Sequence, residues 1–137
     1  MTSAGIGMKM PDGSIKAVRL NCDGYPGHAG VVLAGWYKTA DRVKALLNLG
    51  ELSFLGERFD SSDPGKGNLT IAYGRDGGEE AAFPVQSFPS IEEYHRIGLD
   101  QLSADYLYLY DNGRWLVFGL YNDPDWIEMQ VIIGKEQ

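Results

Sequence analysis

The chain has 137 residues, with 12 Lys and Arg against 19 Asp and Glu, and this length predicts a single domain spanning residues 1–137. Its one cysteine and two histidines exclude a disulfide framework within the chain and a zinc site built on several cysteines. No apolar run approaches the roughly 18 residues of a membrane span, and no secretory signal pattern opens the sequence. We therefore expect a cytoplasmic protein, without membrane contact, that uses neither a metal nor a cofactor.

Charge is spread unevenly along the chain. Residues 1–50 carry six bases and three acids, a net charge of +3, whereas residues 51–137 carry six bases and sixteen acids, a net charge of −10. The sequence lacks the dense basic patch that phosphate contacts require, so we expect no direct nucleic-acid binding. The acidity has two readings: it keeps the protein soluble, or it forms a face for a basic partner.

The first predicted element is a β-hairpin. Residues 4–10 and 15–20 alternate apolar with small or charged side chains on either side of Pro11–Ser14, a strong turn signal. The solvated side of this hairpin is expected to carry its basic residues, which are Lys9, Lys16 and Arg19.

A loop and two helices are predicted next. Residues 21–30 hold three glycines and a proline, which disfavour regular structure. The apolar run 31–37 predicts a buried helix. A second helix is expected between Thr39, a suitable N-cap, and Gly50, with an apolar stripe along one side.

The middle of the chain is the least regular part of the sequence. Residues 60–68 are expected to form an exposed loop, followed by a strand over 69–73, a turn and a return strand within 80–85. A helix is predicted over 89–96, with Ser90 as its N-cap and two glutamates in its first turn.

The clearest predicted element is a second β-hairpin. Residues 105–110 and 114–118 alternate on either side of Asn112-Gly113, the strongest short-range hairpin signal, and a final strand is expected over 126–133. Two arrangements stay open for this hairpin. Its alternating tyrosines face solvent, or they lie under the helices while the leucines pack on another layer.

Together these elements predict an α+β fold. We expect an antiparallel sheet of about five to seven strands with two or three helices packed on one face.

The motifs at Pro11–Ser14 and Asp23–Pro26 resemble those of a family of small bacteriophage, prophage and plasmid proteins. The resemblance continues in order through Gly30–Tyr37, Asp41–Glu57 and Tyr106–Trp126, so it covers nearly the whole chain. The chain departs from that pattern in two places. Ser3-Ala4-Gly5 stands where the family has a basic residue, and Asn21-Cys22 replaces a His-Trp pair. The resemblance implies a mobile-element setting and no established chemistry.

The first candidate site is the loop that carries Asp23, Tyr25 and His28 next to Cys22. A cysteine and a histidine can supply a nucleophile and a base, but a neighbouring aspartate disfavours the thiolate. A Gly-rich stretch before a helix can also hold an anionic, nucleotide-like ligand. The third reading is a structured turn in which Asp23 bonds backbone amides and Tyr25 packs under the helix. We expect no catalytic residues in the chain.

The second candidate site is a surface for a protein partner. Its predicted acidic residues are Asp76, Glu79, Glu80, Glu92 and Glu93. Exposed tyrosines would add to it, because aromatic side chains dominate binding hot spots, and these are Tyr106 and Tyr108. The same acids also fit a solvated face that has no partner.

The sequence favours a phage- or mobile-element-encoded anti-defence protein that binds and occludes a bacterial host protein or nucleoprotein complex; anti-CRISPR proteins are one such class. An acidic face can occupy the basic groove in which such a complex holds nucleic acid. Inhibition by binding requires no catalysis, so an enzyme is disfavoured. The alternative is a nucleotide-like small-molecule binding protein or enzyme that uses the loop from Cys22 to His28.

Overall fold

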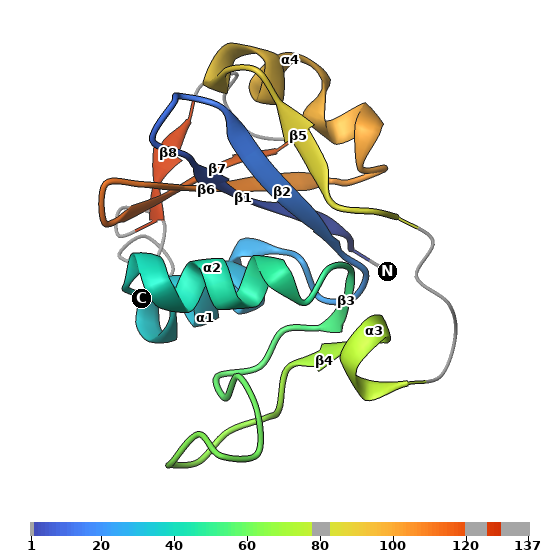
Figure 1. The fold of residues 1–137 in the computed structure, drawn as a ribbon, viewed down its shortest axis with the longest axis vertical. Helices are drawn as coiled ribbons and strands as arrows, with labels where there is room; N and C mark the ends of the chain where they lie inside the picture. Colours follow the sequence, from blue (N-terminus) through green and yellow to red (C-terminus); the bar gives the residue numbers. More distant parts are fainter. Residues whose placement is uncertain (1, 78–82, 120–125, 130–137) are drawn as a thin grey trace.

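The structure is a computed structural model that describes residues 2–77, 83–119 and 126–129. In this part of the chain eight strands form one open, mixed sheet (Figure 1). The strands are β1 (Ala4–Lys9), β2 (Ile15–Leu20), β3 (Leu52–Phe54), β4 (Ile71–Ala72), β5 (Gln86–Phe88), β6 (Tyr106–Asp111), β7 (Arg114–Gly119) and β8 (Ile127–Glu128). The helical elements are η1 (Pro26–Gly30), a π-helical turn, and α1 (Val31–Trp36), α2 (Ala40–Asn48), α3 (Tyr73–Asp76) and α4 (Ile91–Gln101).

The α+β class is confirmed, but the sheet is mixed rather than antiparallel. Its order is β4-β3-β2-β1-β6-β7-β8, with β5 pairing β2, and the pairs β1·β6 and β2·β3 are parallel. The parallel pair at the centre arises because the start of β6 is tied to the start of β1. The backbone N–H of Asp105 donates to the carbonyl oxygen of Ser3 at 3.0 Å, and the N–H of Ser3 donates to the Asp105 carboxylate at 3.1 Å.

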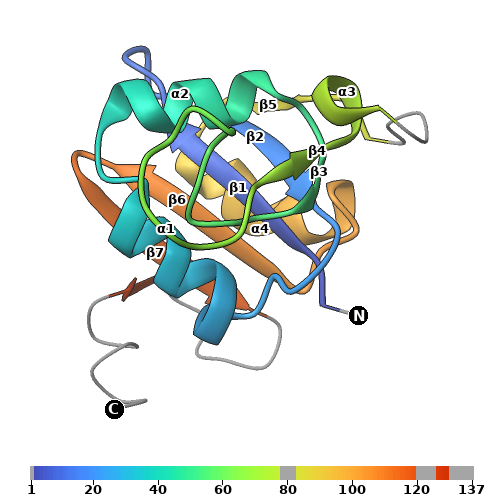
Figure 2. The ribbon, with the colours of Figure 1, turned by 90° about the horizontal axis from the view of Figure 1, so that it is seen from below.

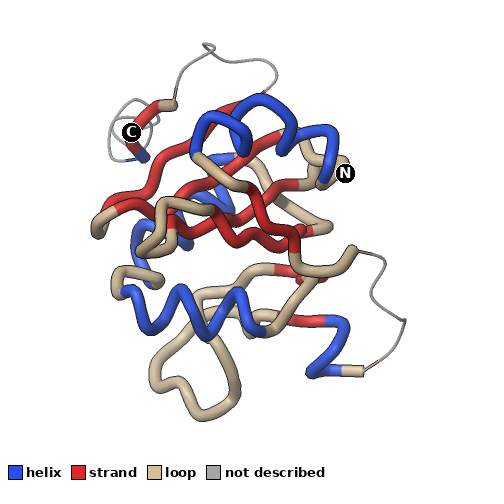
Figure 3. Tube along the Cα trace, turned by 45° about the horizontal axis from the view of Figure 1, so that its top comes forward, coloured by secondary structure: helices blue, strands red, loops and turns tan. Residues whose placement is uncertain are grey.

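Helices cover both faces of the sheet, and this corrects the prediction of one covered face (Figures 1 and 3). The central strand β6 shows why. Tyr108 and Tyr110 lie in the core shared with η1, α1 and α2, whereas Leu107 and Leu109 lie in the core shared with α4. Successive side chains of a strand point to opposite faces, so a central strand that is apolar on both faces needs cover on both.

Two glycines in β1 allow α4 to lie close to the sheet. A Cβ atom added to Gly7 would stand 3.0 Å from the Tyr94 ring, and one added to Gly5 would stand 2.6 Å from Leu102. Tyr94 is fully buried over this strand, and its hydroxyl donates to the carbonyl oxygen of Tyr108 at 2.9 Å. The small residues that alternate with Ile6 and Met8 therefore mark a helix contact.

Most of the predicted elements occur close to their expected places. The N-cap residues are confirmed, since the side chain of Thr39 accepts from the Arg42 N–H and that of Ser90 accepts from the Glu93 N–H. Both hairpins are present, with Asn112 and Gly113 at φ 50° and 84° in the turn of the second. Within the helix predicted over 31–37, Trp36 is 47% exposed, so burial is confined to one side of α1.

The middle of the chain departs more from the expectation. The strand predicted over 69–73 is reduced to the two residues of β4, and the chain then turns directly into α3. The return strand predicted within 80–85 falls partly on residues 78–82, which lie outside the described residues, as does most of the strand predicted over 126–133. The basic residue Arg19, expected on a solvated face, has a half-buried side chain that pairs with Glu51 at 3.4 Å.

Candidate functional site

The segment 55–70 between β3 and β4, which we call the clamped loop, is the most unusual part of the structure. Figure 2 shows it lying across the same face of the sheet as α1 and α2. Loops longer than about 12–15 residues without their own secondary structure are uncommon in compact domains, and they are usually functional or disordered. This loop is held by side chains of other elements, by its own Arg58, and by a backbone bridge between Arg58 and Leu69.

Arg42 of α2 holds the first half of the clamped loop. Its guanidinium donates to the Asp63 carboxylate at 2.8 and 3.3 Å and to the carbonyl oxygen of Glu57 at 3.1 Å. A further bond at 2.6 Å joins its Nε to the carbonyl oxygen of Trp36. The Arg42 side chain thereby joins the end of α1 to the clamped loop. Its planar guanidinium carries several donors, so it can bond both at once.

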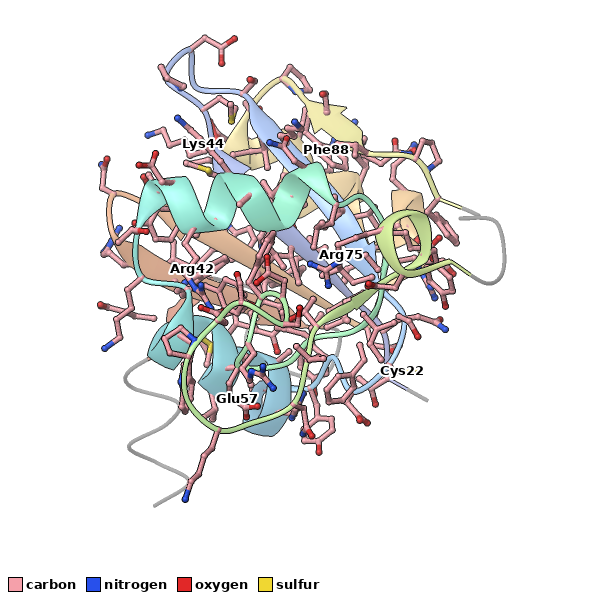
Figure 4. All side chains as sticks on the ribbon, turned by 60° about the horizontal axis from the view of Figure 1, so that its bottom comes forward. Cys22, Arg42, Lys44, Glu57, Arg75 and Phe88 are labelled. Carbon is pink, nitrogen blue, oxygen red and sulfur yellow. The ribbon has the colours of Figure 1, made fainter. Side chains whose placement is uncertain are left out.

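Two further arginines hold the other parts of the loop. Arg75 of α3 donates to the carbonyl oxygens of Phe59 at 2.7 Å and Thr70 at 2.6 Å. Arg58 donates to the carbonyl oxygens of Ser61 and Asp63, both at 3.3 Å. Figure 4 shows Arg42 and Arg75 reaching the loop from different elements.

The base of the clamped loop is closed by buried polar contacts. The Tyr37 hydroxyl donates to the carbonyl oxygen of Gly56 at 3.0 Å and lies 2.9 Å from the Thr70 hydroxyl oxygen. A Cβ atom at Gly56 would stand 2.1 Å from the carbonyl oxygen of Asn68, so glycine is required where the two ends of the loop meet. Burial raises the pKa of the Tyr37 hydroxyl, which keeps it a hydrogen-bond donor.

The carboxylates that bind Arg42 and Arg75, those of Asp63 and Asp76, are held in their charged form. The hydrogen bond from Arg42 is the main cause that lowers the pKa of Asp63, and that from Arg75 lowers the pKa of Asp76. Asp76 also accepts from the N–H of Ala72 at 2.7 Å, which ties α3 to β4. Near neutral pH both carboxylates are therefore charged and keep their hydrogen bonds to Arg42 and Arg75.

Two aliphatic side chains are exposed where the clamped loop ends and β4 begins. Leu69 is 40% and Ile71 46% exposed, and Ile71 pairs in register with Phe54 across β3 and β4. Both residues line two hollows of about 490 and 450 Å³. An apolar ridge with a charged rim is typical of a protein-binding surface.

Three of the five predicted acids of the partner surface, Asp76, Glu92 and Glu93, lie among the described residues. Glu79 and Glu80 lie outside the described residues. Glu93 pairs with Arg96 at 2.7 Å on α4, where Glu92 is exposed, whereas Asp76 pairs with Arg75 at 3.1 Å on α3. Figure 1 shows α4 and α3 on opposite sides of the sheet, so Asp76 does not share a face with Glu92 and Glu93.

The predicted tyrosine contacts require a correction. Tyr108 is fully buried, and its hydroxyl donates to the carbonyl oxygen of Gly24 at 2.7 Å, so it is part of the core rather than a partner contact. Tyr106 is half-buried at the same face of the sheet. Of the two arrangements left open by the sequence, the structure has the one with the tyrosines beneath the helices.

The loop from Cys22 to His28 is tied to β3 and the segment after it. The His28 Nε2 atom lies 2.8 Å from the carbonyl oxygen of Leu55, and the N–H of Cys22 donates to the carbonyl oxygen of Ser53 at 3.2 Å. Asp23 is exposed with a φ of 56°. Tyr25 is 44% exposed and does not pack under the helix. These contacts fit a structured turn that leads into the helical segment formed by η1 and α1.

The sequence did not identify Arg42, Arg58 and Arg75 as residues of a candidate site. Arg58 and Arg75 are bases in a strongly acidic part of the chain, and that contrast was the only signal available. No sequence spacing links either of them to Arg42.

Residues 2–77, 83–119 and 126–129 are the part of the chain that the structure describes. No group of three or more His, Cys, Asp or Glu side chains there is arranged to hold a metal ion. In the same ranges no helix has the length and apolar character required to cross a bilayer. Comparison of the chain with protein-family models, curated proteins and solved structures finds no match.

Proposed function

We propose that this protein is a non-catalytic binding protein of a phage or other mobile element, which occludes a nucleic-acid-binding complex of the bacterial host. The observation that carries the proposal is the clamped loop together with β4, which hold Leu69 and Ile71 exposed, two positions apart in sequence. A surface that is rigid before binding loses little conformational entropy when its partner arrives. The ordering of this long loop is thus better explained by recognition than by stability alone.

Net charge supports a basic partner. The chain carries a net charge of −7, and its acidic part is the one that contains the clamped loop. Complementary charge speeds association and disfavours wrong partners. Nuclease complexes that hold nucleic acid in a positively charged channel match this requirement, so an anti-defence role, including inhibition of CRISPR effectors, is the specific form that we propose.

A reconstituted complex tests this function. The protein is used as bait in lysates of bacteria that carry defence nucleases, the captured complex is purified, and displacement of its labelled nucleic acid is titrated. We expect displacement to be complete at a fixed molar ratio, as for an inhibitor that acts by occupancy. Simultaneous binding of nucleic acid and this protein, or release at far below one equivalent, would contradict the proposal.

A matched pair of variants links the activity to the surface. Leu69→Ser combined with Ile71→Ser removes the exposed ridge, whereas Val85→Ser removes an apolar side chain of similar exposure, 39%, outside the clamped loop. We expect the first variant to lose capture of the host complex and the control to retain it. Both should unfold near the parent midpoint, because exposed substitutions usually change stability by about 0.5 kcal/mol or less.

A further inference from the structure

A smaller hollow, of about 120 Å³, lies between the turn end of the β1–β2 hairpin and the second half of α2. We call it the lysine hollow, and its lining residues are Met8, Met10, Lys16, Lys44, Leu47 and Asn48. Figure 4 shows Lys44 on the side of α2 that is turned toward this hairpin. None of the lining residues belongs to the clamped loop or to the Leu69–Ile71 ridge.

The sheet and the helix each bring one lysine to this hollow. Lys16 pairs in register with Met8 across β1 and β2, so both side chains lie on the face of the sheet that α2 covers. On α2, Lys44 precedes Leu47 and Asn48 by three and four residues, so these three side chains share one side of the helix. The floor between the lysines is apolar, because Met8 is 6% and Leu47 1% exposed.

No acid balances the two positive charges of the lysine hollow. In the described part of the chain no ion pair is formed by Lys16 or Lys44. The acids closest to them in sequence are Asp12 and Asp41, and neither lines the hollow. The Asp12 carboxylate accepts instead from the N–H and the hydroxyl of Ser14, at 3.0 and 2.6 Å. The lining therefore carries two bases and no acid.

The polar groups of the hollow act mainly as hydrogen-bond donors. The Nζ atom of Lys16 donates to the Oδ1 atom of Asn48 at 3.2 Å, which leaves the Nδ2 amide of Asn48 as a donor. A lysine ammonium has three donors and no acceptor, so Lys16 and Lys44 keep further N–H groups for a ligand. This set of donors matches an anionic group.

The size and the floor of the hollow decide which anion fits. A volume of about 120 Å³ lies below the roughly 300–1,000 Å³ of small-molecule pockets, so it suits one side chain rather than a whole ligand. The floor of Met8 and Leu47 favours an anion on a hydrocarbon stem, and methionine adapts to the shape of what it contacts. A phosphate group has oxygen atoms on every side and gains nothing from such a floor.

From this combination we propose that the lysine hollow binds a glutamate side chain of a protein partner. The two methylene groups of that side chain lie against Met8 and Leu47, and its carboxylate meets the ammonium groups of Lys16 and Lys44. The inference goes beyond the proposed function and does not depend on it, because it requires only a partner protein that presents a glutamate.

Two short peptides test the charge requirement. Acetyl-Ala-Glu-Ala-amide and the same peptide with glutamine in place of glutamate are titrated at low salt into the full-length protein, labelled with ¹⁵N. We expect saturable shifts of amide signals within residues 8–16 and 44–48 for the glutamate peptide, with an affinity about fivefold above that for the glutamine peptide. Equal affinities, or shifts spread over the whole surface, would overturn the proposal.

Two further titrations test the choice of occupant. Inorganic phosphate should bind at the same amides more weakly than the glutamate peptide; equal or tighter binding would make the hollow a general anion site and refute the glutamate assignment. Dilution of the protein without peptide should leave these signals in place. Shifts that depend on protein concentration would assign the hollow to a second copy of this chain and would likewise refute the proposal.

A matched pair of lysine variants separates the site from the overall charge. Lys44→Gln removes a charge at an exposed position and should keep the fold, and we expect it to bind the glutamate peptide about fivefold more weakly. Lys38→Gln makes the same change of net charge at an exposed lysine outside the hollow, so its affinity should equal that of the parent. Equal affinities of the two variants would show that the lysine hollow does not bind the peptide.

Discussion

Arg42 and Asp63 form a two-bonded ion pair that joins α2 to the clamped loop. The Arg42 guanidinium donates to both carboxylate oxygens, at 2.8 and 3.3 Å, and the side chains are 27% and 21% exposed. The same carboxylate accepts from the N–H of Phe59. The position of Asp63 and Glu57 in the loop therefore depends on one planar side chain.

Arg42→Lys should release the clamped loop. Lysine keeps the charge but cannot donate to Asp63, Glu57 and Trp36 from one planar group. We expect a loss of about 1–2 kcal/mol in the free energy of unfolding and faster hydrogen exchange at Phe59. Arg96→Lys is the matched control, because Arg96 pairs with Glu93 at an exposed site; equal effects of the two substitutions would mean that the clamp adds nothing beyond a surface ion pair.

Acid should weaken the clamp over a defined pH range. The pKa of Asp63 is lowered from 3.8 in the folded state, mainly by Arg42, so its ion pair contributes stability above that value and loses it as pH falls toward the lower folded pKa. Asp76 acts in the same direction through Arg75. Proteolysis of the loop should therefore rise steeply below about pH 4.

Asp63→Asn is the control for this pH dependence. It should weaken the clamp at pH 7 and flatten the dependence of unfolding free energy on pH below about 4. A variant with the same acid profile as the parent would show that other carboxylates govern the transition.

Gly7→Ala should destabilise the sheet. The added methyl group would stand 3.0 Å from both the Tyr94 ring and Ile15, in a fully packed core. We expect a cost of about 1–3 kcal/mol, measured by urea unfolding. Gly35→Ala in α1 meets no atom within 4 Å and should be neutral or stabilising by up to about 1 kcal/mol, since alanine favours a helix; similar losses at both positions would contradict the role of Gly7 in receiving α4.

Cys22→Ser should leave both fold and partner binding within a few-fold of the parent. The hydrogen bond that joins this residue to Ser53 uses the backbone N–H, which serine retains. Displacement of nucleic acid from the captured complex is the measurement. Complete loss of activity in a folded Cys22→Ser protein would favour the alternative reading, in which Cys22 and His28 act as nucleophile and base.

Charge reversal on α4 should separate steering from contact. We expect Glu92→Lys combined with Glu93→Lys to slow association at low salt, because the double change shifts the net charge toward zero and weakens attraction to a basic partner. The dissociation rate should stay near that of the parent, and 1 M salt should remove the difference between the proteins, since the Debye length falls to about 3 Å. Glu79→Lys with Glu80→Lys is predicted to act in the same way. Equal association rates at low salt would assign the acidity to solubility.

Local sequence signals determined much of the fold. The turn at Pro11–Ser14, the N-caps Thr39 and Ser90 and the turn at Asn112-Gly113 act within a few residues, so spacing and residue type predict them. These signals predicted both hairpins and the two capped helices. They also predicted a loop over residues 60–68, although not the contacts that hold it.

Only the tertiary structure decided what depends on distant residues. The Ser3–Asp105 contacts make the centre of the sheet parallel, and α4 buries the face of β6 that carries Leu107. In the sequence, Tyr108 alternates with Leu107, and this alternation shows that the two side chains lie on opposite faces of the sheet. It does not show which helices cover which face.

The candidate site depends entirely on contacts between residues that are distant in sequence. Arg42, Arg58 and Arg75 come from separate segments, and only the folded chain brings their guanidinium groups to the carbonyl oxygens and carboxylates of the clamped loop. A hydrogen bond between distant segments leaves no period and no fixed spacing in the sequence. Composition alone could therefore predict an acidic chain, whereas the exposure of Leu69 at the end of the clamped loop and of Ile71 at the start of β4 follows from long-range packing.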